Sequence, residues 1–394
     1  MDRERLLVTV TGPDQPAITA ELTSVLVAAG APLLDLEQVV VYGELTLCLV
    51  IEAATPALVE ALRTACAHRA LALTAQAVST GAADPRAVQL AVTVFGDRVD
   101  AAAIHGVARV LAEHGGNIER IHRLSDSDLS AIELIVSVPI GADDLDGRLH
   151  ALRQHLLAAA GAIDIAVQRE SQSRRAKRLV AMDMDSTLIQ MEVIDELARR
   201  AGVGDRVAEL TRRAMLGELD FEQSLRARVG LLAGLDAAHL DDIAAHLPLS
   251  EGAEVLVRVL ARLGYRTAVI SGGFEFAAHA LQRRLGLDYA YANALEVVDG
   301  RVTGRVLEPV VTPARKAALL AEIAAREGID LGQSIAIGDG ANDLPMLEAA
   351  GLGIAFHAKP KLTAAADAAI SHGSLTRVLY LLGLRARDLA ELAP

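Results

Sequence analysis

Two carboxylates separated by one residue, Asp183 and Asp185, directly follow the apolar run Leu179–Met182. Such a run before a polar turn predicts a buried parallel strand, and ligands of open α/β sheets bind at the carboxyl ends of such strands. Alternate residues of an extended segment share a face, so both side chains can face one crevice. Their charges repel unless a cation lies between them. A hard ion such as Mg2+ would remove the repulsion and hold a phosphate at the same place.

Three later segments add groups suited to phosphate chemistry. A predicted strand over residues 267–271 ends at Ser271-Gly272-Gly273, where a hydroxyl and free backbone N–H groups can surround a phosphoryl group. Lys316 supplies a cation at the start of a predicted helix. A strand over residues 334–338 then runs into Asp339 and Asp343, with glycines that permit close backbone approach.

In this order, the motifs resemble those of the haloacid dehalogenase superfamily of aspartate-nucleophile phosphatases. The resemblance implies that Asp183 attacks phosphorus to form an aspartyl-phosphate. It makes Asp185 the general acid and base, an acid that the superfamily's dehalogenases lack. Ser271, the Gly272 N–H group and Lys316 would then stabilise charge on the phosphate oxygens.

The same resemblance implies a metal site. Mg2+ would be held by a side-chain oxygen of Asp183, the backbone carbonyl of Asp185, and Asp339. Asp343 is expected to orient a metal-bound water or Lys316 rather than to bind the ion itself.

From about residue 178 to its end, the chain resembles the phosphoserine phosphatase family. A helical block over residues 192–247 interrupts the α/β alternation, as does the helical cap of these enzymes. The resemblance places substrate contacts at Glu192, Met215, Phe221, Arg228 and Asn342. Glu192 would pair with the substrate ammonium and Arg228 with its carboxylate through a bidentate fork. Met215 and Phe221 would shield the site from water.

The N-terminal half carries an internal repeat. Leu90-Ala-Val-Thr-Val-Phe-Gly96 resembles Leu6-Leu-Val-Thr-Val-Thr-Gly12, and each copy predicts a βαββαβ, ferredoxin-like order. The repeats resemble ACT domains, which commonly bind amino acids. That resemblance makes Gly12, Asp14 and Gly115 candidate ligand contacts, L-serine a candidate regulator, and a homodimer the expected assembly. The alternative is a pair of dimerisation modules that bind no ligand.

The predicted fold class is therefore α/β: two ferredoxin-like ACT domains followed by a Rossmann-like haloacid dehalogenase domain with a helical cap. The predicted boundaries are 1–82, 86–170 and 178–394, with the cap at about 190–250. The basic run over residues 171–178 is interpreted as a solvated linker.

Composition limits the partners. The 394 residues carry a formal charge of −13, which argues against nucleic acid or an anionic membrane as a partner. No apolar stretch is long enough to span a membrane, and the N-terminus lacks the pattern of a signal peptide. Cys48 and Cys66 are the only cysteines and suggest a reducing compartment, although one disulfide between them stays open. The expected location is the cytoplasm.

The leading functional hypothesis is a Mg2+-dependent phosphatase that converts phosphoserine to L-serine, the last step of serine biosynthesis. One alternative is a phosphatase of another small phosphomonoester, because the core motifs determine the chemistry and not the substrate. Another is an amino-acid-sensing regulatory protein whose aspartyl-phosphate is a signal. The Gly338-Asp-Gly-Ala-Asn-Asp343 motif disfavours the signalling hypothesis, since receiver domains lack it.

Overall fold

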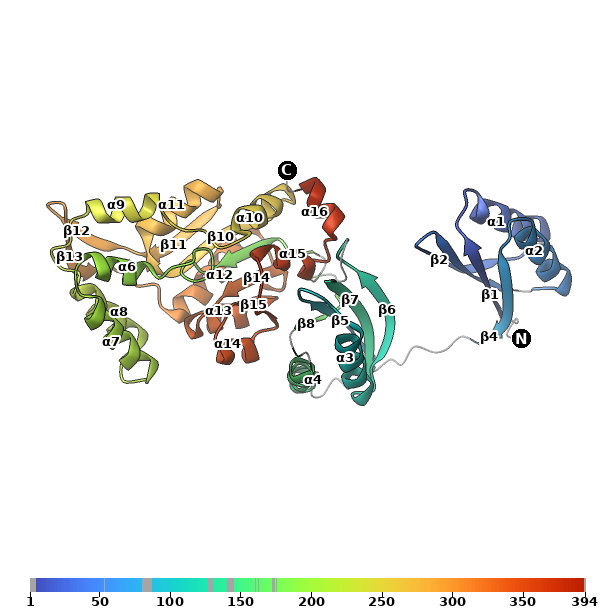
Figure 1. Cartoon of the computed structure of the whole chain (residues 1–394), viewed down its shortest axis with the longest axis horizontal. Helices are drawn as coiled ribbons and strands as arrows, with labels where there is room; N and C mark the ends of the chain where they lie inside the picture. Colours follow the sequence, from blue (N-terminus) through green and yellow to red (C-terminus); the bar gives the residue numbers. More distant parts are fainter. Residues whose placement is uncertain are drawn as a thin grey trace. The chain divides into compact units, whose positions relative to one another are not determined.

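The computed structural model describes residues 5–52, 54–79, 87–126, 130–139, 145–159, 161, 163–171, 174 and 176–392. The chain divides into two compact units, Met1–Asp84 and Pro85–Pro394 (Figure 1). The loop predicted around Pro85 lies outside the described residues. Within the described part, no helix combines the length and the apolar character needed to cross a membrane.

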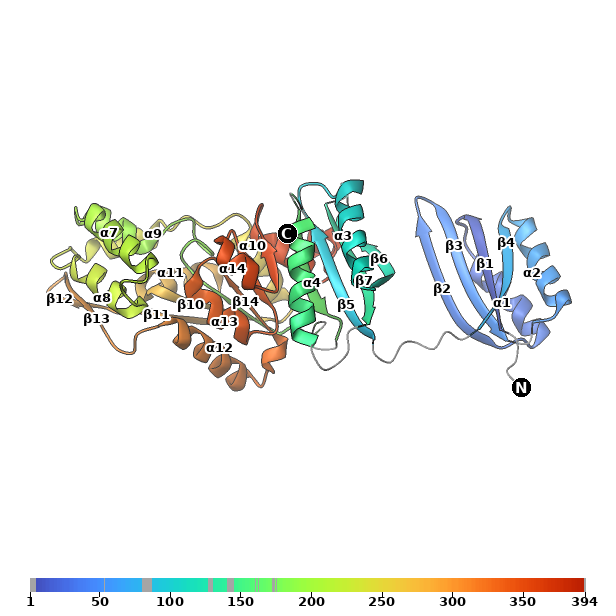
Figure 2. The ribbon, with the colours of Figure 1, turned by 90° about the horizontal axis from the view of Figure 1, so that it is seen from below.

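The first unit is a βαββαβ domain, as its sequence pattern predicts. Its elements are β1 (Arg5–Pro13), α1 (Ile18–Ala29), β2 (Leu33–Val41), β3 (Glu44–Glu52), α2 (Pro56–His68) and β4 (Ala72–Val78). The antiparallel sheet has the order β2-β3-β1-β4, and both helices cover one face (Figure 2). Alternate strand residues such as Val8 and Val10 are buried against the Leu22 face of α1, whereas every residue of the edge strand β2 is exposed.

The second repeat has the same element order. It comprises β5 (Ala87–Phe95), α3 (Ala101–Glu113), β6 (Asn117–Arg123), β7 (Ala131–Pro139), α4 (Leu145–Ala159) and β8 (Asp164–Arg169). Its strand β8 pairs with β16 of the following domain, at Ala166 and Ala368. One sheet of ten strands therefore runs through both domains, a continuity that the sequence pattern does not predict.

The catalytic domain is built on parallel strands alternating with helices. Its core elements are β9 (Leu179–Met182), α10 (Ala253–Arg262), β10 (Arg266–Phe274), α11 (Glu275–Leu285), β11 (Tyr289–Asn293), α12 (Pro313–Glu327), η2 (Leu331–Gln333), β14 (Ser334–Gly338), η3 (Ala341–Asp343), α13 (Leu344–Ala349), β15 (Gly353–Phe356), α14 (Pro360–Ala365) and β16 (Ala368–Ile370). Strand β9 lies between β10 and β14, parallel to both, and all four of its residues are buried. The apolar run predicted as a buried strand is therefore central in the sheet.

The C-terminal tail is helical, but in pieces. A single helical tail over residues 376–392 is the expectation, whereas the structure has η4 (Leu375–Arg377), α15 (Val378–Leu381) and α16 (Ala386–Leu392). The break falls at Gly383, whose φ of 75° cannot continue a right-handed helix.

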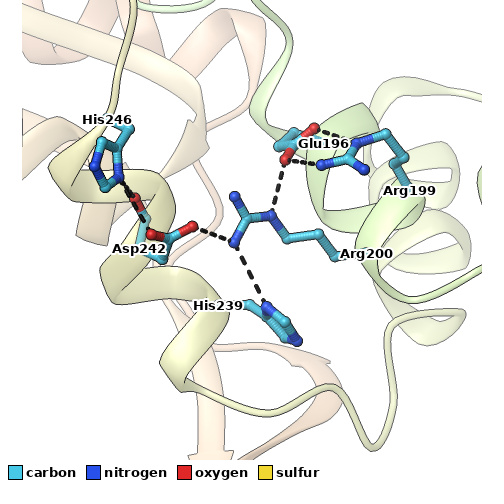
Figure 3. A network of polar contacts seen from close by, with 6 residues as sticks. All are labelled: Glu196, Arg199, Arg200, His239, Asp242 and His246. Atoms are coloured by element: carbon cyan, nitrogen blue, oxygen red, sulfur yellow. Dashed lines mark hydrogen bonds and ion pairs between the residues drawn. The ribbon is translucent and has the colours of Figure 1, made fainter.

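The cap consists of four helices and a hairpin: α6 (Val193–Arg200), α7 (Gly204–Met215), α8 (Phe221–Gly230), α9 (Ala238–Ala245), β12 (Leu295–Val298) and β13 (Arg301–Val306). A polar network joins α6 to α9 (Figure 3). Arg200 donates to Glu196 at 2.8 Å and to Asp242 at 2.6 Å, and Asp242 also contacts His246 at 3.2 Å. The network fixes the orientation of α6, whose N-terminal end faces the site described below.

The interpretation of residues 171–178 as a solvated linker is wrong for two of its cations. The side chains of Arg174 and Lys177 are only 9% and 6% exposed. Both residues line a cavity together with residues of β8 and residues beside the amino ends of β14 and β15, so these side chains have protein on several sides.

Candidate active site

Asp183 lies at the carboxyl end of the central strand β9. Its N–H group donates to the Ile337 carbonyl of the neighbouring strand at 2.9 Å, and its side chain is buried. Beyond it the chain turns sharply, because the N–H groups of Leu188 and Ile189 both donate to the Met184 carbonyl. The turn brings Asp185 back to the same cavity as Asp183.

Lys316 is fully buried in the first turn of α12. Its Nζ lies 2.8 Å from Asp183 Oδ1 and 2.6 Å from Asp343 Oδ1. Burial alone would lower the pKa of Lys316, but the two carboxylates outweigh burial and raise it. Asp343 also accepts from the Gly340 N–H group at 3.0 Å. Asp343 therefore holds the ammonium against Asp183.

Three carboxylates converge beside this ammonium. Asp183, Asp339 and Asp343 each offer an oxygen within 4.8 Å of the others. Burial first, and then the neighbouring carboxylates, raise the pKa of Asp339 to about 8 and that of Asp343 to about 6. A divalent cation bound by hard carboxylate oxygens would relieve this repulsion. The donor set fits such an ion.

Asp185 has the surroundings of a carboxyl group that keeps its proton. Burial, followed by the charges of Glu192 and Asp183, raises its pKa well above the usual range. Its Oδ1 accepts from the Val193 N–H group at 3.2 Å, at the start of α6. A Cβ atom on Gly273 would lie 2.6 Å from Asp185 Oδ2, so glycine is what lets the loop pass the acid closely.

The irregular carboxyl end of β10 presents the groups predicted to contact phosphate. Ser271 is buried and its Oγ accepts from the Gly273 N–H group at 2.9 Å. Asn293, at the end of β11, donates to the Gly272 carbonyl at 2.8 Å and accepts from the Val311 N–H group at 2.7 Å. Sequence reasoning missed Asn293, because an isolated Asn at a strand end gives no signal for partners about twenty residues away.

A cavity of about 320 Å³ joins these groups to the cap. The predicted residues that line it are Asp183, Asp185, Glu192, Met215, Phe221, Arg228, Ser271, Gly272, Asp339 and Asn342. Lys316 and Asp343 lie buried beside it rather than on its lining. Two charged lining residues that the sequence did not single out are Asp195 and Lys359.

Opposite charges face each other across the cap side of the cavity. Burial raises the pKa of Glu192, against the hydrogen bond that its carboxylate accepts from the Ser186 hydroxyl at 2.8 Å. Burial lowers the pKa of Arg228, with Asp195 and then Glu192 opposing the shift. A carboxylate and a guanidinium in one partly dry cavity suit a zwitterionic ligand.

Phe221 and Met215 differ in how well they cover the cavity. Phe221 packs on the loop below, where a Cβ atom on Gly272 would lie 2.7 Å from its ring. Met215, at the end of α7, is 68% exposed. In this conformation Phe221 covers the site and Met215 stands at its rim without shielding it from water.

The candidate ligand contacts of the small domains lie in separate units. Gly12 has a φ of 148°, and a Cβ atom there would lie 2.8 Å from Leu71 Cδ2. The Asp14 N–H group donates to the Gly43 carbonyl at 2.8 Å. Gly115 follows α3 with a φ of 73°. Ala17 adopts a φ of 71°, a left-handed conformation that costs a residue with a Cβ atom about 1–2 kcal/mol.

The fold and the site define the class. The model of haloacid dehalogenase-like hydrolases matches residues 180–348, and two ACT domain models match residues 4–78 and 89–168, which confirms the predicted fold class. The chain is 47% identical to the phosphoserine phosphatase of Streptomyces coelicolor, over 97% of this chain and 93% of that relative. It is 43% identical to a phosphoserine phosphatase of Mycobacterium tuberculosis, over 96% and 93% of the two chains. This chain belongs to the phosphoserine phosphatase family.

A solved structure extends the likeness to the catalytic domain in three dimensions. It is described as a phospho-aspartyl intermediate analogue of phosphoserine phosphatase and is 46% identical to this chain. The match has a TM-score of 0.50 and covers 52% of this chain and 98% of that one.

Proposed function

We propose that the protein hydrolyses O-phospho-L-serine to L-serine and phosphate, the last step of serine biosynthesis. The observation that carries this proposal is a single cavity lined by Asp183 and Asp185 on the core side and by Glu192 and Arg228 on the cap side, with the Lys316 ammonium buried beside Asp183. The first three groups suit phosphoryl transfer, and the facing pair suits the ammonium and carboxylate of an amino acid. The names of the relatives agree with this substrate.

The chemistry proceeds in two steps. Asp183 attacks phosphorus and forms an aspartyl-phosphate, while protonated Asp185 gives its proton to the departing serine oxygen. Asp185 then takes a proton from the water that hydrolyses the aspartyl-phosphate. Ser271, the Gly272 N–H group and Lys316 stabilise charge on the transferring phosphoryl group throughout.

Metal dependence is general in this class of phosphatases, and we infer that the ion is Mg2+. The proposed ligands are Asp183, Asp339 and the backbone carbonyl of Asp185, with Asp343 left to hold Lys316 at 2.6 Å. When bound, the ion would neutralise the carboxylates and a phosphate oxygen. The convergence of three carboxylate oxygens within 4.8 Å supports this assignment.

Substrate choice is assigned to the cap. Glu192 pairs with the ammonium, and Arg228 binds the carboxylate through its two terminal nitrogens, since its Nε already donates to the Ser224 carbonyl at 3.3 Å. Phe221 covers the ligand, Met215 lies at the rim of the cavity, and Asn342 contacts the ligand from the core side. These roles explain why charged side chains are placed in a largely desolvated cavity.

The test is phosphate release from phosphoserine, phosphothreonine, a sugar phosphate and an aryl phosphate in the presence of Mg2+. Arg228→Ala should raise the activation free energy for phosphoserine by about 2–3 kcal/mol, which lowers kcat/KM roughly 30- to 150-fold. It should leave kcat/KM for the aryl phosphate nearly unchanged. Arg226→Ala is the matched control, because Arg226 is on the same helix and pairs with Glu222 away from the site. Equal losses on both substrates would make Arg228 a structural residue. A preference for sugar phosphates would assign the enzyme to another small phosphomonoester.

We also propose a homodimer assembled through the small domains, with L-serine as a weakly bound regulator. The edge strand β2 exposes Leu33, Val39 and Val41, and unpaired apolar edges of this kind favour strand or face pairing. Sedimentation should give twice the chain mass, and calorimetry with L-serine tests the regulator. Domain boundaries at 82/86 and 170/178 and a cytoplasmic location remain proposals of the same kind.

A further inference from the structure

A second cavity, of about 510 Å³, lies at the opposite edge of the catalytic sheet from the active site. It is lined by Lys177, Gly332 and Leu352. These residues lie one or two positions before the parallel strands β9, β14 and β15, respectively. The carboxyl ends of the same strands carry Asp183 and Asp339. The other wall comes from α4 and β8 of the second small domain, which borders the catalytic domain (Figures 1 and 2).

The lining of this cavity is strongly cationic. Among the described residues that line it, Arg153, Arg169, Arg174 and Lys177 are cations, and Asp367 is the one acid. Asp367 Oδ1 lies 2.8 Å from Arg153 Nη2, and its Oδ2 accepts from the Gly353 N–H group at 2.9 Å. Asp367 is therefore paired with Arg153 and not with Lys177.

Lys177 is the most deeply buried of these cations. Its Nζ donates to the carbonyl oxygens of Gly332 at 2.7 Å and Ser334 at 3.4 Å, which are neutral acceptors. Burial lowers the pKa of Lys177 to about 8, with Asp367 opposing this shift and Arg174 adding to it. A buried ammonium without an adjacent carboxylate is stabilised by any anion that enters the cavity.

The two arginines leave donors unused. Both terminal nitrogens of Arg174 pair with Glu133 and Glu170, yet its Nε is buried and has no partner among the described residues. The Nε of Arg153 is also buried and has no partner among the described residues. Buried N–H groups without acceptors are costly and therefore rare in native proteins, so each points to an acceptor that the protein chain does not supply.

We propose that this cavity is a binding site for a small oxyanion, a phosphate or carboxylate group, contacted by Lys177 and by the Nε groups of Arg153 and Arg174. The site is separate from the catalytic cavity and from the turn residues Gly12 and Asp14. A bound anion joins the second small domain to the amino ends of the catalytic strands. It stabilises their mutual arrangement by accepting from donors that both sides contribute.

The experiment measures phosphate bound per chain by equilibrium dialysis of the full-length protein with inorganic phosphate. The wild type should bind two, one in each cavity. Lys177→Gln, which keeps a donor for the Gly332 carbonyl but loses the charge, and Arg153→Gln should bind one, with phosphoserine turnover retained as evidence of folding. Arg178→Gln is the control, because Arg178 is an exposed cation in the same segment. Two phosphates bound by both cavity variants, or one by the wild type, would overturn the proposal.

A second measurement does not depend on the folding of any variant. Wild-type crystals soaked in selenate should show an anomalous peak beside Lys177, and no peak at saturating selenate overturns the site. Competition with malonate in the dialysis separates the two sources of the anion. Displacement of one phosphate identifies a site that accepts carboxylates, and its absence identifies a site restricted to phosphate-like anions.

Discussion

The close passage of the Gly273 backbone beside the general acid offers a direct test of Asp185. In Gly273→Ala, the new Cβ atom would lie 2.6 Å from Asp185 Oδ2 and 2.7 Å from Met184 Cε. Ordinary contact needs about 3.4 Å or more, so the carboxyl group must move by nearly 1 Å. A displacement of this size at a catalytic group costs roughly 100-fold in rate. The fold should persist, because φ at position 273 is not positive and the backbone N–H group of this residue still donates to Ser271 Oγ.

The assay compares three substrates of Gly273→Ala. Phosphoserine and ethyl phosphate both release an alkoxide that needs a proton, whereas nitrophenyl phosphate releases a stable anion that does not. We expect kcat/KM, which reports phosphoryl transfer to Asp183, to fall about 100-fold on the first two and by less than about threefold on the third. In contrast, kcat should fall on all three, because Asp185 also activates the water that hydrolyses the shared aspartyl-phosphate. Asp185→Asn should show the same pattern, which links the effect to the acid. Arg228→Ala differs, since it should spare ethyl phosphate.

Gly272→Ala provides the matched control, because its Cβ atom would meet the Phe221 ring at 2.7 Å and not the acid. This variant should change KM without a dependence on the leaving group. If Gly273→Ala lowers kcat/KM equally for all three substrates, the end of β10 acts on phosphate binding and the assignment of Asp185 as proton donor fails. If it slows none, the carboxyl group is not held where the structure has it.

Three further predictions concern the nucleophile, the carboxylate cluster and the first small domain. Asp183→Asn should lower steady-state turnover by far more than tenfold while keeping the fold, and activity within about tenfold of the wild type would place the nucleophile elsewhere. In metal-free protein the pKa of Asp339 is raised to about 8, so the folded state binds the extra proton between about pH 4 and 8 and stability falls as pH rises through that window. Melting temperatures should therefore decline less in Asp339→Asn, and added Mg2+ should reverse the wild-type decline; equal pH slopes in both proteins would contradict this assignment. Ala17→Gly should raise the unfolding free energy of a fragment of residues 1–84 by about 1 kcal/mol, because glycine adopts the φ of 71° without strain, and unchanged chemical denaturation would show that the turn is relaxed.

Most of the element order follows from local pattern. The strand Ser334–Gly338 is predicted with the bounds that the structure has, and both repeats have the predicted βαββαβ order. The apolar periods and terminating glycines behind these predictions are properties of short windows. The short strands β11 and β16 were missed, since three to five residues of mixed character carry no clear period.

The sequence by itself determined which groups meet at the active site. Asp183, Ser271 and Asp339 each follow an apolar run, and parallel strands bring their carboxyl ends to one edge of the sheet. Only the tertiary structure decided what holds these groups. The Asn293 contact to Gly272, the Asp343 contact to Lys316 and the pairing of β8 with β16 join segments 21, 27 and about 200 residues apart.

The basic segment before β9 shows most clearly that a local sequence pattern does not predict contacts between residues far apart in the chain. Its composition is that of an exposed linker, and composition reports the average surroundings of a charge. Lys177 is instead buried beside the Gly332 carbonyl, 155 residues further along the chain. Burial is decided by what folds over a residue. Here that includes the second small domain, whose strand β8 pairs with β16 of the catalytic domain. A local sequence window contains no record of such a neighbour.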